Sequence, residues 1–445
     1  MNQYIGLLGV VVLLLLACAF SENRRRINWR IVFAGVALQF VIAFMLLKVP
    51  GVVDAFDLFA RGVTRVISFA DEGIRFLFGA VANPGGSWGF VFAIHVLPII
   101  IFFSAFMSVL YHLGIMQRIV SVVAWALRAI LGITGVEALS AAANVFVGQT
   151  EAPLTVKPYI AGMTRSQIMA VMVGGFATIA GSVMAAYINM LGGDNMEAKV
   201  LFAKHIMTAS LMSAPAGIVM AKIMLPETES PRDESLTALA RDGRTTTNVL
   251  DAAAAGATDG LKLAANVAAM LIAFVALLAM INWPLAALCE VNSIAAWRAA
   301  HGIPVLTLQN ILGFILTPIG WLVGAGDDAS KVGSLLGTSV IATEFVGYQN
   351  LARMVAANAN PASGETGISV RAAAIATFCL CGFANIPSIA IQIGGLSALA
   401  PSRRADLAAI APRAMVAGAL ACWMTGAVAG LFIAWAGGGW GPGWS

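Results

Sequence analysis

Charged residues are scarce in this chain of 445 residues, because only 11% are Asp, Glu, Lys or Arg while 60% are hydrophobic. So few charges cannot cover the surface of a soluble protein of this length, which predicts that a lipid bilayer is the solvent. The 26 basic and 22 acidic residues leave a net charge of +4, too small an excess to predict a nucleic-acid partner.

Cysteine and histidine are also rare. The five cysteines have neither the spacing of a zinc site nor that of a disulfide framework, and the four histidines are scattered. No phosphate-binding loop, nucleophile elbow or metalloprotease helix is present. We therefore expect no cofactor, no enzymatic activity and no ATP-driven pump.

Eight apolar stretches approach the length of about 20 residues that crosses a bilayer. They lie near 4–20, 31–48, 88–112, 166–190, 200–224, 261–283, 370–395 and 413–435. No positive charge precedes the first stretch, whereas Arg24, Arg25 and Arg26 follow it, which is the reverse of a signal peptide. By the positive-inside rule we expect a multi-pass inner-membrane protein with both termini outside the cytoplasm.

Four further stretches do not fit simple crossings. Residues 53–69 and 114–130 have helical apolar spacing with charges on the other face, which predicts helices at the membrane interface. Residues 131–157 and 331–355 are rich in Gly, Ala and Thr, and we expect them to form re-entrant hairpins. The polar stretch 226–248 is predicted to be a cytoplasmic linker between two halves.

Each predicted hairpin carries a glutamate within a locally uncharged apolar stretch, Glu151 in the first and Glu344 in the second. A carboxylate at membrane depth costs roughly 2.5 kcal/mol or more, so it usually faces a cavity and binds an ion, a proton or a solute. The alternative is a carboxylate that caps the amino terminus of a hairpin helix, and the two roles are compatible.

An internal repeat is indicated by short matches. Gly175-Phe-Ala-Thr-Ile179 resembles Gly382-Phe-Ala-Asn-Ile386, and Thr-Glu precedes each segment. An odd number of crossings separates the two hairpins, so the copies are expected to be inverted. Inverted repeats with broken helices are typical of secondary transporters.

Uncharged polar side chains surround the glutamates and the predicted breaks. They are Asn144, Gln149, Thr150, Thr178, Ser182, Thr338, Ser339, Thr343, Asn385 and Ser388. Amides and hydroxyls can hydrogen-bond a neutral polar solute, and their oxygens together with free carbonyls suit a hard cation such as sodium. We expect Pro387 to break its helix and free a carbonyl.

Four motifs in order resemble the concentrative nucleoside transporter family. They are Gly148-Gln-Thr-Glu-Ala-Pro-Leu154, Phe176-Ala-Thr-Ile-Ala-Gly-Ser-Val183, Glu344-Phe-Val-Gly-Tyr348 and Cys381-Gly-Phe-Ala-Asn-Ile-Pro-Ser388. The resemblance runs from about residue 90 to the carboxyl terminus. It implies a homotrimer in which a scaffold holds a transport domain that moves like an elevator.

The resemblance also implies a division of the chain and a site. Residues 1–113 would form the first scaffold part, 114–225 the first transport repeat, 226–284 the linker and a scaffold helix, and 285–445 the second transport repeat. The implied nucleoside site comprises Gln149, Thr150 and Glu151 for the base, Glu344, Asn385 and Ser388 for the ribose, and Val183 and Phe383 as pocket walls. The implied cation site uses the Asn144 and Thr178 side chains with the Val147 and Ile179 carbonyls.

Two departures leave questions open. Ser339 stands where the family usually has Lys, and Thr343 stands where it has Asn, so base preference and coupling ion are not settled by the resemblance. We expect symport of nucleosides with sodium, and protons carried by a glutamate are the alternative. Other readings are the same fold carrying a nucleobase or modified nucleoside, a membrane enzyme, and a passive channel.

Overall fold

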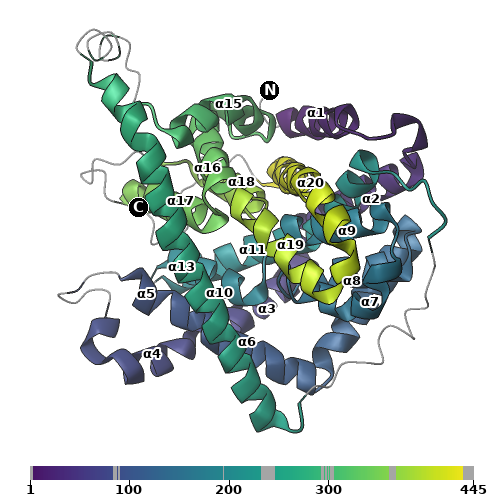
Figure 1. The fold of residues 1–445 in the computed structure, drawn as a ribbon. Coiled ribbons are helices and arrows are strands. Elements are labelled where there is room, and N and C mark those ends of the chain that lie inside the picture. The colour runs from purple at the N-terminus through teal and green to yellow at the C-terminus, as the bar shows by residue number, and fades with distance from the viewer. Residues whose placement is uncertain are drawn as a thin grey trace.

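The computed structural model describes residues 4–83, 88, 91–193, 195–231, 246–291, 295, 298, 300, 305–359 and 367–433. Every regular element within these ranges is a helix, which confirms the all-α prediction (Figure 1). The α-helices are α1 (Ile5–Ala19), α2 (Trp29–Lys48), α3 (Pro50–Ser68), α4 (Ala70–Phe78), α5 (Phe92–His95), α6 (Leu97–His112), α7 (Ile115–Leu131), α8 (Gly135–Asn144), α9 (Arg165–Ala177), α10 (Gly181–Gly192), α11 (Met196–Met224), α13 (Val249–Cys289), α15 (Leu308–Leu322), α16 (Ala329–Ile341), α17 (Glu344–Ala359), α18 (Val370–Cys379), α19 (Ile386–Leu399) and α20 (Arg404–Phe432). Short 3₁₀ segments are η2 (Arg24–Arg26), η3 (Gly79–Ala82), η4 (Ala152–Gly162), η5 (Gly326–Asp328) and η7 (Pro401–Arg403).

Within the described ranges, 6 helical segments are long and apolar enough to cross a bilayer. They are α2, α5 with α6, α9 with α10, α11, α13, and η7 with α20. The other two predicted crossings, 4–20 and 370–395, are the 15-residue α1 and the broken pair α18 and α19.

The helix that contains the sixth predicted crossing extends beyond the apolar stretch at both ends. We expected 261–283, but α13 runs for 41 residues from Val249 to Cys289. The approach to the apolar stretch contains an unbroken run of alanines at 252–255, and alanine has the highest helix propensity. This alanine run explains why the helix begins before the apolar stretch. Of the predicted linker, 232–245 lies outside the described residues.

Both predicted hairpins consist of two helical limbs joined by a break. In the first, residues 145–151 separate α8 from η4, and in the second, residues 342–343 separate α16 from α17. The predicted interfacial helices correspond to α3 and α7, and α15 occupies the equivalent place before the second hairpin.

The two halves repeat the same order of elements. An amphipathic helix (α7 or α15) precedes a hairpin, a broken helix (α9–α10 or α18–α19) and a long helix (α11 or α20). The two breaks lie against each other, because a Cβ on Gly382 would stand 2.6 Å from the Phe176 carbonyl oxygen. Cys422 Sγ also lies 3.5 Å from the carbonyl oxygens of both Ala177 and Cys381. The repeat thus brings two helix breaks together in the interior.

Burial separates central helices from flanking ones. The most apolar windows of α9–α10 and α11 are 94% buried, whereas that of α13 is 11% buried. In Figure 1, α13 runs diagonally along one side of the molecule. It packs closely on α6, where Cβ atoms on Gly256 and Gly260 would lie 2.7 Å from Ser104 O and 2.8 Å from Ile101 Cα. This small-xxx-small spacing allows two membrane helices to approach at backbone distance.

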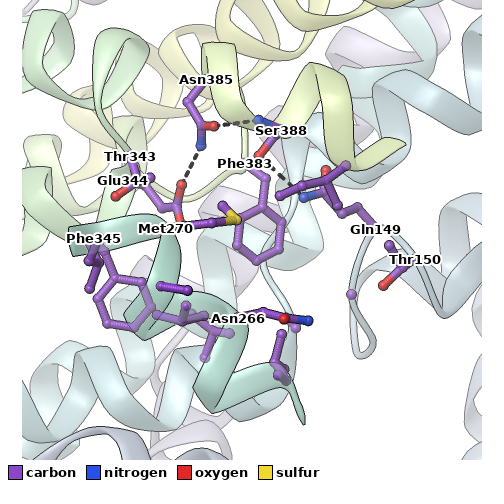
Figure 2. A pocket seen from close by; sticks show the side chains of 18 of the residues that line it. Gln149, Thr150, Asn266, Met270, Thr343, Glu344, Phe345, Phe383, Asn385 and Ser388 are labelled. Carbon is purple, nitrogen blue, oxygen red and sulfur yellow. Dashed lines mark hydrogen bonds between the residues drawn. The ribbon is translucent and has the colours of Figure 1, made fainter. Parts of the chain in front are cut away.

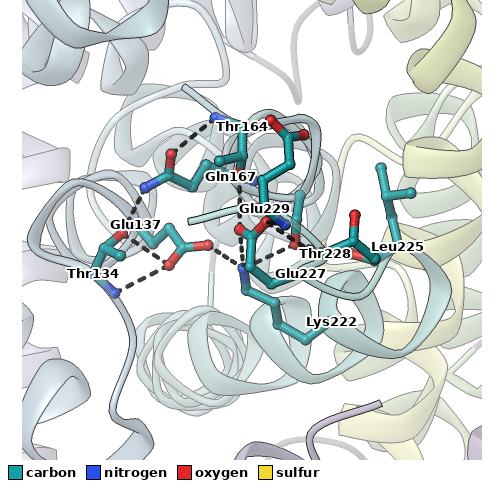
Figure 3. Close-up of polar contacts among 10 residues, drawn as sticks. Thr134, Glu137, Thr164, Gln167, Lys222, Leu225, Glu227, Thr228 and Glu229 are labelled. Atoms are coloured by element: carbon teal, nitrogen blue, oxygen red, sulfur yellow. Dashed lines mark hydrogen bonds and ion pairs between the residues drawn. The ribbon is translucent and has the colours of Figure 1, made fainter. Parts of the chain in front are cut away.

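A buried polar cluster connects the start of α8, in the first hairpin, to α9 and α11 (Figure 3). Glu137 forms a capping box at the start of α8, where its Oε2 accepts hydrogen bonds from the Thr134 backbone N–H at 3.1 Å and hydroxyl at 2.9 Å. Its Oε1 pairs with Lys222 Nζ of α11 at 2.5 Å. Lys222 also donates to Ser166 Oγ on α9 at 3.0 Å. One lysine therefore joins hairpin 1 to α9 and α11.

Candidate solute site

A cavity of about 380 Å³ lies where the two hairpin turns and the two helix breaks meet α13 (Figure 2). This volume is within the range of about 300–1,000 Å³ that small-molecule sites occupy. Its lining includes all eight residues that we predicted for the nucleoside, namely Gln149, Thr150, Glu151, Val183, Glu344, Phe383, Asn385 and Ser388. The structure thus brings together side chains up to 239 positions apart.

Glu344 is the buried acid of this cavity, with 3% of its surface exposed. It is the first residue of α17, so the helix dipole favours its negative charge. Tyr187 donates a hydrogen bond to its Oε1 at 2.9 Å, and Asn385 Nδ2 donates to its Oε2 at 2.6 Å. The backbone N–H of Glu344 also hydrogen-bonds the carboxylate, and because a carboxylate has about four acceptor sites, capacity remains for a hydroxyl donor of a solute. Both roles that the sequence allowed, helix cap and pocket acid, are therefore combined in one residue.

Gln149 is fixed by a chain of amide hydrogen bonds. Its Nε2 donates to Ser388 Oγ at 3.3 Å, and its Oε1 accepts from Gln392 Nε2 at 3.1 Å. Gln392 Nε2 also donates to the Met172 carbonyl oxygen at 3.0 Å, which anchors the chain to α9. The amide of hairpin 1 is thereby held against the second broken helix.

The second helix break differs in detail from the prediction. We expected Pro387 to break the helix, but residues 380–385 form the break and Pro387 lies in the first turn of α19, where proline needs no hydrogen-bond donor. Asn385 caps α19 because its Oδ1 accepts from the Ser388 backbone N–H at 2.8 Å. Its amide nitrogen remains directed at Glu344, so one side chain both ends the break and positions the acid.

Glu151 has a different environment from Glu344. It lies in the turn between α8 and η4 and is exposed to the cavity rather than buried. Besides the solute cavity, it lines an adjoining cavity of about 600 Å³. The neighbouring Thr150 side chain hydrogen-bonds its carboxylate, and a Cβ on Gly148 would collide with its Oε2.

The predicted cation ligands lie behind the cavity. Asn144 is fully buried; its Nδ2 donates to Ser140 O at 3.0 Å, and its Oδ1 has no hydrogen-bond partner among the described residues. A Cβ on Gly174 would lie 3.0 Å from the Asn144 amide nitrogen, and the carbonyl of Gly174 accepts the Thr178 hydroxyl at 2.8 Å. Val147 and Ile179 lie in the breaks, outside the helices. An orphaned buried amide oxygen beside such backbone fits a sodium ion.

Several site residues were not predicted. Tyr187 holds Glu344, and the α13 side chains Asn266 and Met270 form a wall of the cavity. Of the two departures from the family motif, Thr343 lines the cavity, whereas Ser339 lies among the residues of a separate small space behind hairpin 2. Thr343 is therefore placed to affect the solute directly.

Family models match most of the chain. The model described as Na+ dependent nucleoside transporter C-terminus matches residues 205–430, its N-terminal counterpart matches 8–81, and the nucleoside recognition model matches 93–194. An uncharacterized transporter of Haemophilus influenzae is 45% identical over 97% of this chain and 98% of its own length. Sodium/nucleoside cotransporter 1 of Rattus norvegicus is 39% identical over 97% of this chain and 64% of its own length.

Solved structures agree with this assignment. CNTnw in an inward-facing substrate-bound state is 40% identical, covers 97% of this chain and 98% of its own, and has a TM-score of 0.85. A double variant of CNTnw in an outward-facing state has the same identity and coverage and a TM-score of 0.83. The chain belongs to the family of sodium-dependent nucleoside transporters.

The family settles the class of activity. This chain is a multi-pass membrane protein and a sodium-coupled nucleoside transporter that works by alternating access, not an enzyme. The sequence-based prediction of a nucleoside transporter is confirmed, and the choice between sodium and protons falls to sodium.

Proposed function

We propose that the chain takes up nucleosides through the cavity between the hairpins, with Glu344, Asn385 and Ser388 binding the ribose. The observation that carries this proposal is the buried Glu344 carboxylate in the wall of the cavity, which Tyr187 and Asn385 hold at 2.9 and 2.6 Å. Paired ribose hydroxyls are donors that match such an acid, and charge-assisted hydrogen bonds are the stronger class.

The base would lie on the hairpin 1 side. Gln149 offers an amide held in one orientation, and Thr150 and Glu151 lie next to it in the same turn. An amide that cannot rotate freely distinguishes donors from acceptors on the edge of a base. Val183 and Phe383 would provide the apolar walls against the base and sugar.

Sodium would bind at Asn144 and Thr178 with the carbonyls of Val147 and Ile179. The support is the unpartnered Asn144 Oδ1 and the position of both carbonyls outside helices. Sodium prefers oxygen ligands, and all four groups supply oxygen. Because these residues belong to hairpin 1 and to the first helix break, an ion there would order the segments that carry Gln149.

The domain division and the topology also remain proposals. We infer a transport domain built of the two hairpins and the buried broken helices, and a scaffold that includes α6 and α13. The apolar window of α9–α10 is 94% buried, whereas those of α5–α6 and α13 are 33% and 11% buried, which supports this division. We also propose that the protein lies in the inner membrane with its linker in the cytoplasm. Both termini would then lie on the opposite side, outside the cytoplasm.

A homotrimer is the assembly that we propose. Large apolar side chains on the flanking helices are exposed in the single chain, such as Ile272 at 73%, Trp283 at 76% and Phe314 at 82%. Lipid or neighbouring subunits would cover them. Chemical crosslinking of the detergent-purified protein would show a three-subunit limit, and a limit of one or two would contradict the trimer.

The ribose assignment is tested by Glu344→Gln. The amide keeps the size of the side chain but loses the charge and one acceptor, so uptake of labelled uridine into proteoliposomes should fall to background. Glu290→Gln is the matched control, since Glu290 is exposed at the end of α13 and outside the cavity. Near-normal uptake by a folded Glu344→Gln protein would refute the assignment.

A further inference from the structure

Three adjoining cavities follow one side of α13. The first, of about 600 Å³, is lined by Gly256, Asp259 and Leu263 of this helix. The solute cavity begins at Leu263 and ends at Leu271, and a third cavity of about 450 Å³ continues from Leu271 to residue 279. Adjoining cavities share Leu263 or Leu271. The solute cavity is thus the middle part of a series that extends along the helix.

The chemistry of α13 changes along this series. Asn266 is the one polar residue that α13 contributes to the solute cavity in the described structure. The α13 residues that line the third cavity are all apolar, namely Leu271, Ile272, Val275, Ala276 and Ala279. A solute at that level would therefore meet an apolar wall, whereas a solute in the present cavity meets an amide.

The Asn266 amide is free to bind a solute. In Figure 2 it points from α13 into the open space below Phe383 and toward Thr150, on the hairpin 1 side. Its side chain has no hydrogen-bond partner among the residues that the structure describes. Asn282 of the same helix shows the usual alternative, because its amide bonds Gln309 and the Leu308 backbone N–H at 2.8 Å each. An unpaired amide at membrane depth is unfavourable unless a ligand or water satisfies it.

We propose that Asn266 hydrogen-bonds the base of the nucleoside only while the site stands in its inward position, and so determines affinity on the cytoplasmic side. This inference rests on the proposed placement of the base at Gln149 and Thr150 and of the linker in the cytoplasm. The amino-terminal end of α13 follows that linker, so the cavity at Asp259 opens toward the cytoplasm. All predicted solute ligands are on the moving hairpins and broken helices, whereas Asn266 belongs to the scaffold.

Alternating access then makes the contact dependent on state. When the transport domain shifts outward, its ligands travel with the solute and face the apolar part of α13 beyond Leu271. A scaffold side chain cannot follow, so the Asn266 bond breaks. The hydrogen bond to Asn266 stabilises the inward-facing state and leaves the outward-facing state unchanged. It therefore shifts the equilibrium between these two states by the free energy of that hydrogen bond.

The test compares the two sides of the membrane in proteoliposomes that hold the protein in one orientation. Uridine is the probe, and its half-saturating concentration is measured from outside by uptake and from the cytoplasmic side by counterflow. For Asn266→Ala we expect the cytoplasmic value to rise roughly three- to tenfold, the equivalent of one neutral hydrogen bond. The external value should stay within about twofold. Thr258→Ala is the control, since the Thr258 hydroxyl is exposed and, among the described residues, donates to the Ala254 carbonyl of its own helix.

Each other outcome decides against the proposal. An unchanged half-saturating concentration on the cytoplasmic side would show that Asn266 does not bind the solute. Equal rises on both sides would show that the contact does not depend on the state of the transporter. The loss should be the same for uridine and 2′-deoxyuridine, because the base is common to both; a loss confined to uridine would place the amide on the sugar. If Asn266→Ala is poorly folded, Asn266→Ser provides the same comparison. Failure of the wild type to carry either uridine or adenosine would refute the proposed function instead, which separates the two ideas.

Discussion

The buried pair between Glu137 and Lys222 gives the sharpest stability prediction. The two side chains are 2% and 6% exposed, so neither charge is solvated by bulk water. Lys222→Met keeps the length and apolar stem of the side chain but leaves the Glu137 carboxylate without its cation. Removing one partner of a buried pair costs about 3–5 kcal/mol. Glu227 Oε2 lies 3.9 Å from Lys222 Nζ, but its side chain is 23% exposed and accepts a hydrogen bond from the Thr164 hydroxyl, so its charge stays solvated in the variants.

Removing both charges should restore most of this loss. In Glu137→Gln/Lys222→Met the glutamine can still cap α8, and replacing a buried pair by neutral groups is often nearly neutral or stabilising. Arg61→Gln is the control, because Arg61 and Glu197 form a pair of 2.8 Å that is 50% and 70% exposed, and water screens it. The stability of these three variants is measured by heating the purified proteins in detergent and monitoring the loss of folded protein by size-exclusion chromatography. A stable Lys222→Met protein, or a double variant as unstable as the single one, would refute the reasoning.

Three further predictions address transport and packing. Gln149→Ala should change the order in which unlabelled nucleosides inhibit uridine uptake, and an unchanged inhibition profile would count against its contact with the base. Asn144→Ala should raise the sodium concentration for half-maximal uptake roughly tenfold or more, as expected for loss of a ligand oxygen to a charged partner; an unaltered sodium dependence would remove Asn144 from the cation site. Gly260→Val should separate α6 from α13, because a Cβ there would lie 2.8 Å from Ile101 Cα, and the unfolding temperature should fall; an unchanged temperature would show that the helices adjust.

The two glutamates could be predicted from the sequence because of a strong physical constraint. A charge within apolar sequence at membrane depth is costly, which predicted that Glu151 and Glu344 face a cavity and bind an ion, a proton or a solute. The helix breaks were indicated by paired motifs, and their neighbours Asn385 and Ser388 entered the site with them. The structure places all of these residues around one cavity.

The scaffold side of the cavity could not be predicted in the same way. Asn266 is an uncharged residue in a long apolar helix, where an amide usually bonds a neighbouring helix. Which of its surroundings it faces depends on how α13 packs against the other elements, and no local pattern contains that information. Tyr187 was missed for the same reason, because an apolar helix with one tyrosine does not reveal a carboxylate 157 positions away.

Helix ends were the weakest part of the sequence-based prediction. Hydrophobicity located α13 but not its limits, because the alanine run at 252–255 favours helix without being strongly apolar. Pro387 was expected to interrupt a helix and instead begins one, since proline disrupts a helix interior but is well tolerated in the first turn. Both errors arise from judging a residue without its position in the helix.

The central claim is that a sodium gradient drives nucleosides through this cavity. The most direct measurement is accumulation of labelled uridine in proteoliposomes under an inward sodium gradient, compared with a proton gradient of the same size and with potassium in place of sodium. The account predicts accumulation above the external concentration with sodium alone, which Glu344→Gln abolishes. Accumulation driven by protons alone, or mere equilibration of uridine across the membrane, would contradict it.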